Sequence, residues 1–89
     1  MEHPRIVHIV LDVLKSHQPA LPEFTASIGV FEGVQRVDVA VDEIDEETVS
    51  LRVVIDGDVN YDGLKTYLAR YGAEIHSVDR VIVEDLEVG

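Results

Sequence analysis

The apolar residues of this chain switch between two spacings, one typical of strands and one typical of helices, and this succession limits the fold more than any other feature. Residues 6–14 are almost continuously apolar and rich in β-branched side chains, which predicts a strand in the centre of a sheet. Apolar residues at helical spacing then run from Leu21 to Phe31, and they predict a helix that ends near Gly33.

The second half of the chain repeats these signals after a hairpin. Residues 34–42 and 49–56 alternate between apolar and polar, and the polar segment 45–47 predicts the turn that connects them. Asn60 can cap a following helix, which ends near Gly72. Residues 74–84 complete the pattern with a last strand.

The predicted order is therefore strand, helix, strand, strand, helix, strand, which is that of the ferredoxin-like fold of the α+β class. We expect a four-stranded antiparallel sheet with both helices on one face. A chain of 89 residues is too short for two hydrophobic cores, so residues 1–89 should form a single domain. The other face of the sheet has no element of this chain to cover it.

The charge of the chain argues against several partners. Eighteen acidic residues against seven basic ones give a net charge of −11, which opposes binding to nucleic acid and to anionic membranes. The acidic residues are dispersed and lysine is rare, as in proteins that work in concentrated salt, so we expect a halophilic source; an ordinary acidic protein is the alternative. The chain has no apolar run of signal-peptide or transmembrane length, which predicts a cytoplasmic location.

The motifs of common enzymes are missing from the sequence. The chain contains no Cys, no glycine-rich phosphate loop, no G-x-S-x-G and no H-E-x-x-H. His76, Ser77 and Asp79 are close in sequence, but alternation along a strand places His76 on the opposite face from the other two. We therefore expect a protein that is not an enzyme and binds no organic cofactor.

The first predicted strand is apolar in both registers, so apolar side chains should also line the face of the sheet that no helix covers. Exposed Val and Ile residues in this number favour contact with other copies of the chain, although scattered surface aliphatics are common. The sequence predicts that the interface residues on this face are Ile6, Val10, Val78 and Ile82.

The hairpin predicts a cation site. Its residues 42–47 include five carboxylates, and calcium prefers several oxygen ligands on flexible segments. Alternation places three of them on one side, so the candidate ligands for calcium or another divalent cation are Glu43, Asp45 and Glu47, followed by Asp42. A solvated turn is the alternative within one chain, whereas close carboxylates from two subunits favour a bridging cation.

A weaker candidate is a transition-metal site on the open face of the sheet. If the strands pair as expected, His76 shares this face with His8 and Asp12 of the first strand. Imidazole and carboxylate groups are suitable ligands, but nothing in the sequence fixes their separation, and a structural role for His76 is the alternative.

Three segments resemble a known family. They are LDVLKSHQP at residues 11–19, VDEIDEET at residues 41–48 and YGAEIHSVDRV at residues 71–81, and together they resemble the archaeal family of domain of unknown function 211. The resemblance implies a ferredoxin-like, ring-forming homo-oligomer of unassigned activity, with calcium in some members. The chain departs from the family pattern at Ser16, where a proline is usual, and at Glu84 and Asp85, where a glycine is usual.

Taken together, these features predict a self-assembling structural or scaffold protein, a homo-oligomeric ring that can associate further and that divalent cations stabilise. The alternative is a small-molecule or metal-ion sensing module with its ligand at the subunit interfaces, which rests on analogy with other ferredoxin-like domains.

Overall fold

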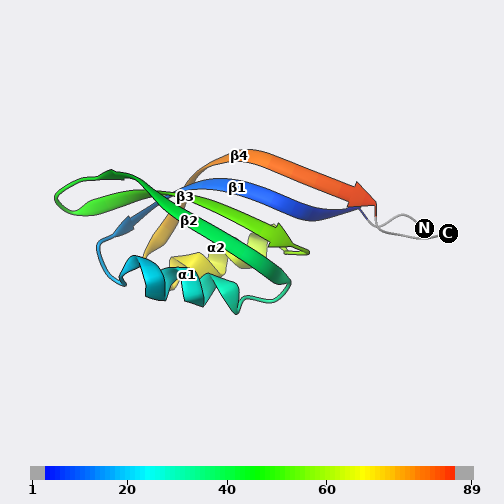
Figure 1. Ribbon diagram of the computed structural model, residues 1–89, viewed down its shortest axis with the longest axis horizontal. Coiled ribbons are helices and arrows are strands. Elements are labelled where there is room, and N and C mark those ends of the chain that lie inside the picture. Colours follow the sequence, from blue (N-terminus) through cyan, green and yellow to red (C-terminus); the bar gives the residue numbers. More distant parts are fainter. Residues whose placement is uncertain (1–3, 86–89) are drawn as a thin grey trace.

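The computed structural model of the protein describes residues 4–85 and confirms the predicted order of elements (Figure 1). Their bounds are β1 Pro4–Ser16, α1 Leu21–Gly29, β2 Val34–Ile44, β3 Thr48–Gly57, α2 Tyr61–Ala69 and β4 Ala73–Asp85. The fold is thus the expected α+β, ferredoxin-like βαββαβ arrangement. Residues 1–3 and 86–89 lie outside the described part.

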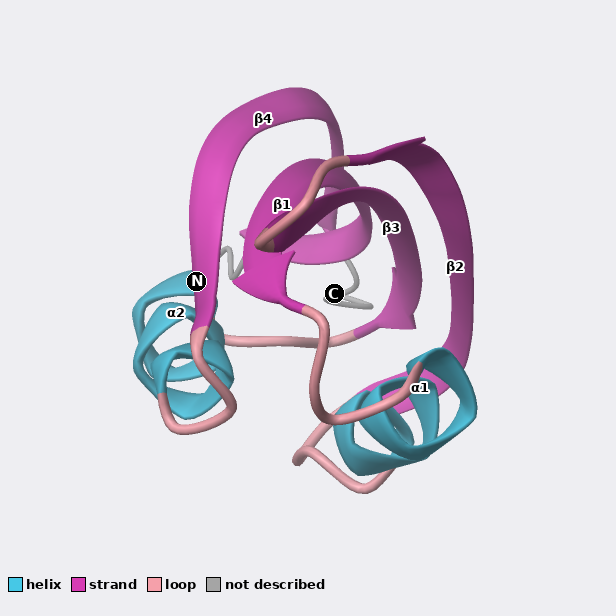
Figure 2. Ribbon diagram, turned by 90° about the vertical axis from the view of Figure 1, so that its left-hand side faces the viewer, coloured by secondary structure: helices cyan, strands magenta, loops and turns pink. Residues whose placement is uncertain are grey.

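The four strands form one antiparallel sheet in the order β2-β3-β1-β4. β1 and β3 are therefore the inner strands, and β2 and β4 are the edges. Both helices lie on the same side of the sheet, as Figure 2 shows from the end of the molecule. We call this side the helix face and the opposite side the open face.

The hydrophobic core fills the space between the helix face and the two helices. Alternate residues of the inner strands point into it, and each helix contributes two fully buried side chains. Burial of each such side chain stabilises the fold by roughly 1.5–3 kcal/mol. The central members of the core are Ile9, Leu11, Val13, Leu51, Val53, Ile55, Phe24, Ile28, Leu64 and Leu68.

The two helices differ from their predicted ends. α1 stops at Gly29, before the predicted end near Gly33, and α2 stops at Ala69, before Gly72. Gly33 has a φ of 90°, and a Cβ at this position would collide with the carbonyl oxygen of Asp58. The tight turn from α1 into β2 is therefore made at Gly33, after the helix has ended. The Asn60 cap is confirmed, since its side chain accepts a hydrogen bond of 2.7 Å from the Gly63 N–H.

The strands are much longer than the helices that cover them. β1 and β4 have 13 residues each, or about 43 Å of extended chain, whereas each helix has 9 residues, or about 14 Å. The molecule is 52 Å long as a result. The sheet therefore projects beyond the helices, and Figure 1 shows the start of β1 and the end of β4 without a helix beneath them.

Candidate functional site

Where β1 and β4 project past α2, the helix face carries a line of exposed apolar side chains. A shallow groove of about 280 Å³ at this place is lined by Ile6, Ile9, Tyr61, Val78 and Val81, all of them apolar or aromatic. Val83 continues the line, because it lies opposite Ile6 in the sheet. The exposed fractions of Val78, Val81 and Val83 are 42%, 45% and 52%. We call Ile6, Tyr61, Val78, Val81 and Val83 the apolar strip.

The apolar strip differs from the predicted interface, because the four predicted residues do not share one face. Val10 and Ile82 lie on the open face, whereas Ile6 and Val78 lie on the helix face. The reason is a β-bulge beside each misplaced residue. The register between β1 and β4 shifts between Ile6 and His8 and between Val10 and Leu11, which leaves Val7 and Asp79 as extra residues. Each extra residue reverses the alternation of the side chains beyond it.

The middle of the open face is better covered than the sequence suggested. Val10 is only 2% exposed, although α1 and α2 both lie on the other side of the sheet. It is on an inner strand, between Val54 of β3 and Arg80 of β4, which lie directly opposite it. Val10 is therefore a buried residue of the single chain, while Ile82 is partly buried on the same face.

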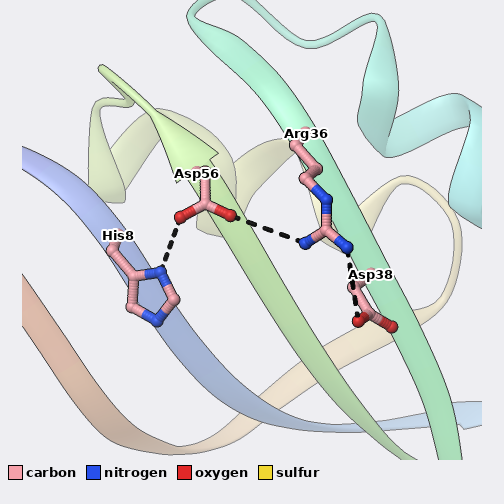
Figure 3. A network of polar contacts seen from close by, with 4 residues as sticks. All are labelled: His8, Arg36, Asp38 and Asp56. Carbon is pink, nitrogen blue, oxygen red and sulfur yellow. Dashed lines mark hydrogen bonds and ion pairs between the residues drawn. The ribbon is translucent and has the colours of Figure 1, made fainter.

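A polar network crosses the open face from β1 to β2 (Figure 3). His8 Nδ1 lies 2.6 Å from Asp56 Oδ1 on β3, and Arg36 Nη1 of β2 lies 3.8 Å from Asp56 Oδ2. Arg36 Nη2 also lies 4.0 Å from Asp38 Oδ2. The sequence analysis missed Asp56 and Arg36 as partners of His8, because only the register His8↔Asp56 between β1 and β3 brings them together. His8 thus contacts Asp56 and not Asp12 or His76, the other two residues of the predicted transition-metal site.

Asp12 and His76 lie beside the same hollow of the open face. Together with Leu14 and Ser50 they line a small cavity of about 160 Å³. His8 does not line this cavity. Within residues 4–85, no group of three or more His, Asp or Glu side chains gathers in a way that could hold a metal ion. The predicted set of His8, Asp12 and His76 is therefore reduced to a pair in one chain.

All five acidic residues of the hairpin are exposed. The Asp45 N–H donates to the Thr48 carbonyl at 2.8 Å, and the His17 Nε2–H donates to the Asp45 carbonyl at 2.8 Å, so the turn is tied to the loop after β1. The residues Asp45, Glu46, Glu47 and Thr48 line a wide hollow. Glu43 lies opposite Ser50, after a register shift that leaves Asp42 as an extra residue. The four candidate calcium ligands Asp42, Glu43, Asp45 and Glu47 thus form no metal-holding group within one chain, and the calcium site remains a prediction for ligands from two chains.

Lys15 is the one charged residue buried in the described part of the chain, and the sequence analysis did not single it out. It is 3% exposed at the end of β1, where alternation places it on the helix face. Its Nζ donates to the carbonyls of Ser16 at 2.8 Å and Pro19 at 2.6 Å, and it lies 5.1 Å from the centre of the Phe24 ring. Burial lowers the pKa of this amine below its usual value. Lys15 therefore ties the end of β1 to the start of α1.

No helix of the described residues has the length and apolar content that a membrane span requires.

Comparison with known proteins finds similarity over nearly the whole chain. The family model DUF211, described as Uncharacterized ArCR, matches residues 7–87. The uncharacterized protein MJ0319 of Methanocaldococcus jannaschii is 33% identical over 78 residues, which cover 86% of this chain and 80% of that protein. Neither description names an activity or a ligand.

Proposed function

The chain belongs to the DUF211 family, and we propose that it is a homo-oligomeric structural protein that covers its apolar strip with other copies of itself. One observation carries the proposal. The exposed fractions of Val78, Val81 and Val83, which lie in one line along β4, are between 42% and 52%. A contiguous line of exposed apolar side chains is a common mark of an interaction site. We propose no enzymatic activity for this chain.

The two edges of the sheet support assembly into a closed ring. β2 has 11 residues and β4 has 13, and within residues 4–85 each has a strand on one side only. Long edges with free backbone groups are places where another chain can add. A chain with two such edges can contact two neighbours, and contacts of this kind close into a ring when the rotation between subunits allows it.

The charge of the chain supports a role for salt and divalent cations in this assembly. Every added subunit brings a net charge of −11, and the acidic hairpin concentrates five carboxylates within residues 42–47. Calcium or another divalent cation between hairpins of two subunits would offset their repulsion. We therefore also propose that the protein works in a salt-rich cytoplasm and that a divalent cation strengthens its assembly.

A sensing or binding module is the second candidate. The cavity lined by Asp12, Leu14, Ser50 and His76 favours this second function. It offers the carboxylate of Asp12 and the imidazole of His76 to a ligand. Its volume of about 160 Å³ is below the roughly 300–1,000 Å³ of usual small-molecule pockets. Self-assembly is for this reason the better-supported function.

The mass of the protein in solution tests the proposal. We expect sedimentation to give a mass well above the 9.9 kDa of one chain, and we expect Val81→Asp to lower it while the circular dichroism spectrum stays unchanged. Val30→Asp is the matched control, because Val30 is 79% exposed and lies outside the apolar strip. A mass of one chain at all salt and protein concentrations would overturn the proposal.

A further inference from the structure

β4 has a free edge. It pairs with β1 on one side, and within residues 4–85 no strand lies on its other side. Bulges at His76 and Asp79 interrupt the first half of the strand, and such irregularities protect an edge from pairing. From Arg80 to Glu84 the strand has no extra residue, so this segment is the regular part of the edge.

Side chains of this regular segment alternate between the two faces. Arg80, Ile82 and Glu84 lie on the open face, and Val81 and Val83 belong to the apolar strip on the helix face. Arg80 and Glu84 are both exposed, and neither forms an ion pair within the described residues. The segment therefore carries an apolar centre with a free cation at one end and a free anion at the other.

The sequence Arg-Val-Ile-Val-Glu is complementary to itself when a second copy runs antiparallel to it. With Ile82 opposite Ile82 of the second copy, Arg80 lies opposite Glu84 twice, and Val81 lies opposite Val83 twice. Apolar pairs and pairs of opposite charge directly across two strands stabilise a sheet. A two-fold axis perpendicular to the sheet keeps each side chain opposite one on its own face.

Neighbouring registers lack this match. Centring the axis on Val81 would place Arg80 opposite Ile82, and centring it on Val83 would place Glu84 opposite Ile82. Either shift buries a charge against an apolar side chain and removes both ion pairs. Only the register centred on Ile82 satisfies all five positions.

We propose that two copies of this chain join through the outer edges of β4, antiparallel about a two-fold axis at Ile82, into one eight-stranded sheet. The inference rests on the proposed self-assembly and identifies its first contact. The pairing packs Val81 and Val83 of one copy against those of the other at the axis, which covers part of each apolar strip. The β2 edge is then left for contacts between one such pair and the next, and a cation must bridge these contacts because the hairpin at the end of β2 holds five carboxylates and no basic residue within positions 42–47.

Charge exchange tests the pairing. Arg80→Glu and Glu84→Arg each replace both ion pairs by pairs of like charge, and we expect each to raise the dissociation constant about tenfold or more. The double variant restores both pairs with reversed polarity, so its dissociation constant should return toward that of the unchanged protein. Sedimentation at the lowest salt that keeps the protein folded measures these constants. Arg70→Glu and Glu32→Arg are the controls, since they change the net charge equally at exposed positions outside β4.

A cysteine placed on the axis tests the register. The chain has no Cys, so Ile82→Cys creates a single thiol that faces its own copy, and mild oxidation with diamide should join two chains. Val83→Cys is the control, because its thiol faces Val81 of the second copy and should join chains far more slowly. An oligomer that neither responds to the charge variants nor joins through Ile82→Cys would overturn the β4 pairing but leave self-assembly intact. Equal joining through Val83→Cys would overturn the register, and a protein that is always monomeric would overturn both proposals.

Discussion

His8 and Asp56 face each other across β1 and β3, and His8 Nδ1 lies 2.6 Å from Asp56 Oδ1. The pair is half-buried, with 20% of the His8 side chain and 36% of the Asp56 side chain exposed. We expect Asp56→Asn to lower the free energy of unfolding by no more than about 1 kcal/mol, because partly exposed hydrogen bonds and ion pairs contribute little. Urea denaturation measures this change, with Glu32→Gln as the control at an exposed position outside the network. A loss of several kcal/mol would show that the network has a larger role in the fold.

The buried amine of Lys15 predicts a pH effect on stability. Its pKa in the folded protein is lowered from the usual 10.5 by burial, so the unfolded chain holds this proton more tightly. The contribution of Lys15 to the free energy of unfolding should therefore increase as the pH rises from the pKa of Lys15 in the folded protein toward 10.5. We expect the free energy of unfolding of the unchanged protein to rise over this range relative to that of Lys15→Met, which has nothing to titrate at this position. A difference between the two proteins that does not vary with pH would contradict the prediction.

Gly33 and Gly29 form a matched pair for a test of backbone strain. Gly33→Ala should lower the free energy of unfolding by at least about 1 kcal/mol, because Gly33 has a φ of 90° and a Cβ there would meet the Asp58 carbonyl. Gly29→Ala should leave it unchanged or raise it by up to about 1 kcal/mol, since the nearest atom to its new Cβ is 3.9 Å away at Val37. Thermal unfolding of the two variants measures their stabilities. A Gly33→Ala protein as stable as the Gly29→Ala protein, or more stable, would contradict the prediction.

Salt should stabilise both the fold and the assembly. Eighteen acidic residues repel one another within one small domain, and the Debye length falls to about 3 Å at 1 M salt. We expect the melting temperature and the oligomer mass to increase from dilute buffer to molar potassium chloride. Calorimetry and light scattering over this range measure the two quantities. An unchanged melting temperature would count against adaptation to salt.

Calcium should strengthen the assembly through the acidic hairpin. A cation held between two subunits binds only the assembled state, so at a free concentration of 100 times its dissociation constant it would add about 2.7 kcal/mol per site. The combined change Glu43→Gln and Asp45→Asn should abolish this effect and leave the fold intact, because both residues are exposed. Titration calorimetry with calcium measures the binding, and Glu23→Gln with Asp62→Asn is the control of equal charge. The absence of calcium heat from the unchanged protein would leave the hairpin as a solvated turn.

Much of the fold could be predicted because hydrophobic spacing is a local property. The period of two in residues 34–42 and the helical spacing after Leu21 depend only on which neighbours along the chain share a face. The order of these segments then leaves few topologies. The same reasoning placed Asp12 and His76 on one face, where the structure brings them to one cavity.

The candidate site could not be predicted in full because it depends on register between strands. Alternation alone put Ile6 and Val78 on the open face, and the bulges at Val7 and Asp79 moved them to the helix face. A bulge adds one residue to one strand, and whether it forms is decided by the packing of the whole sheet against its helices. Local spacing along this sequence thus determined the elements, their order and the core, whereas only the tertiary structure decided which side chains meet. Contacts such as His8 with Asp56 exist because the register of two distant strands places them opposite each other.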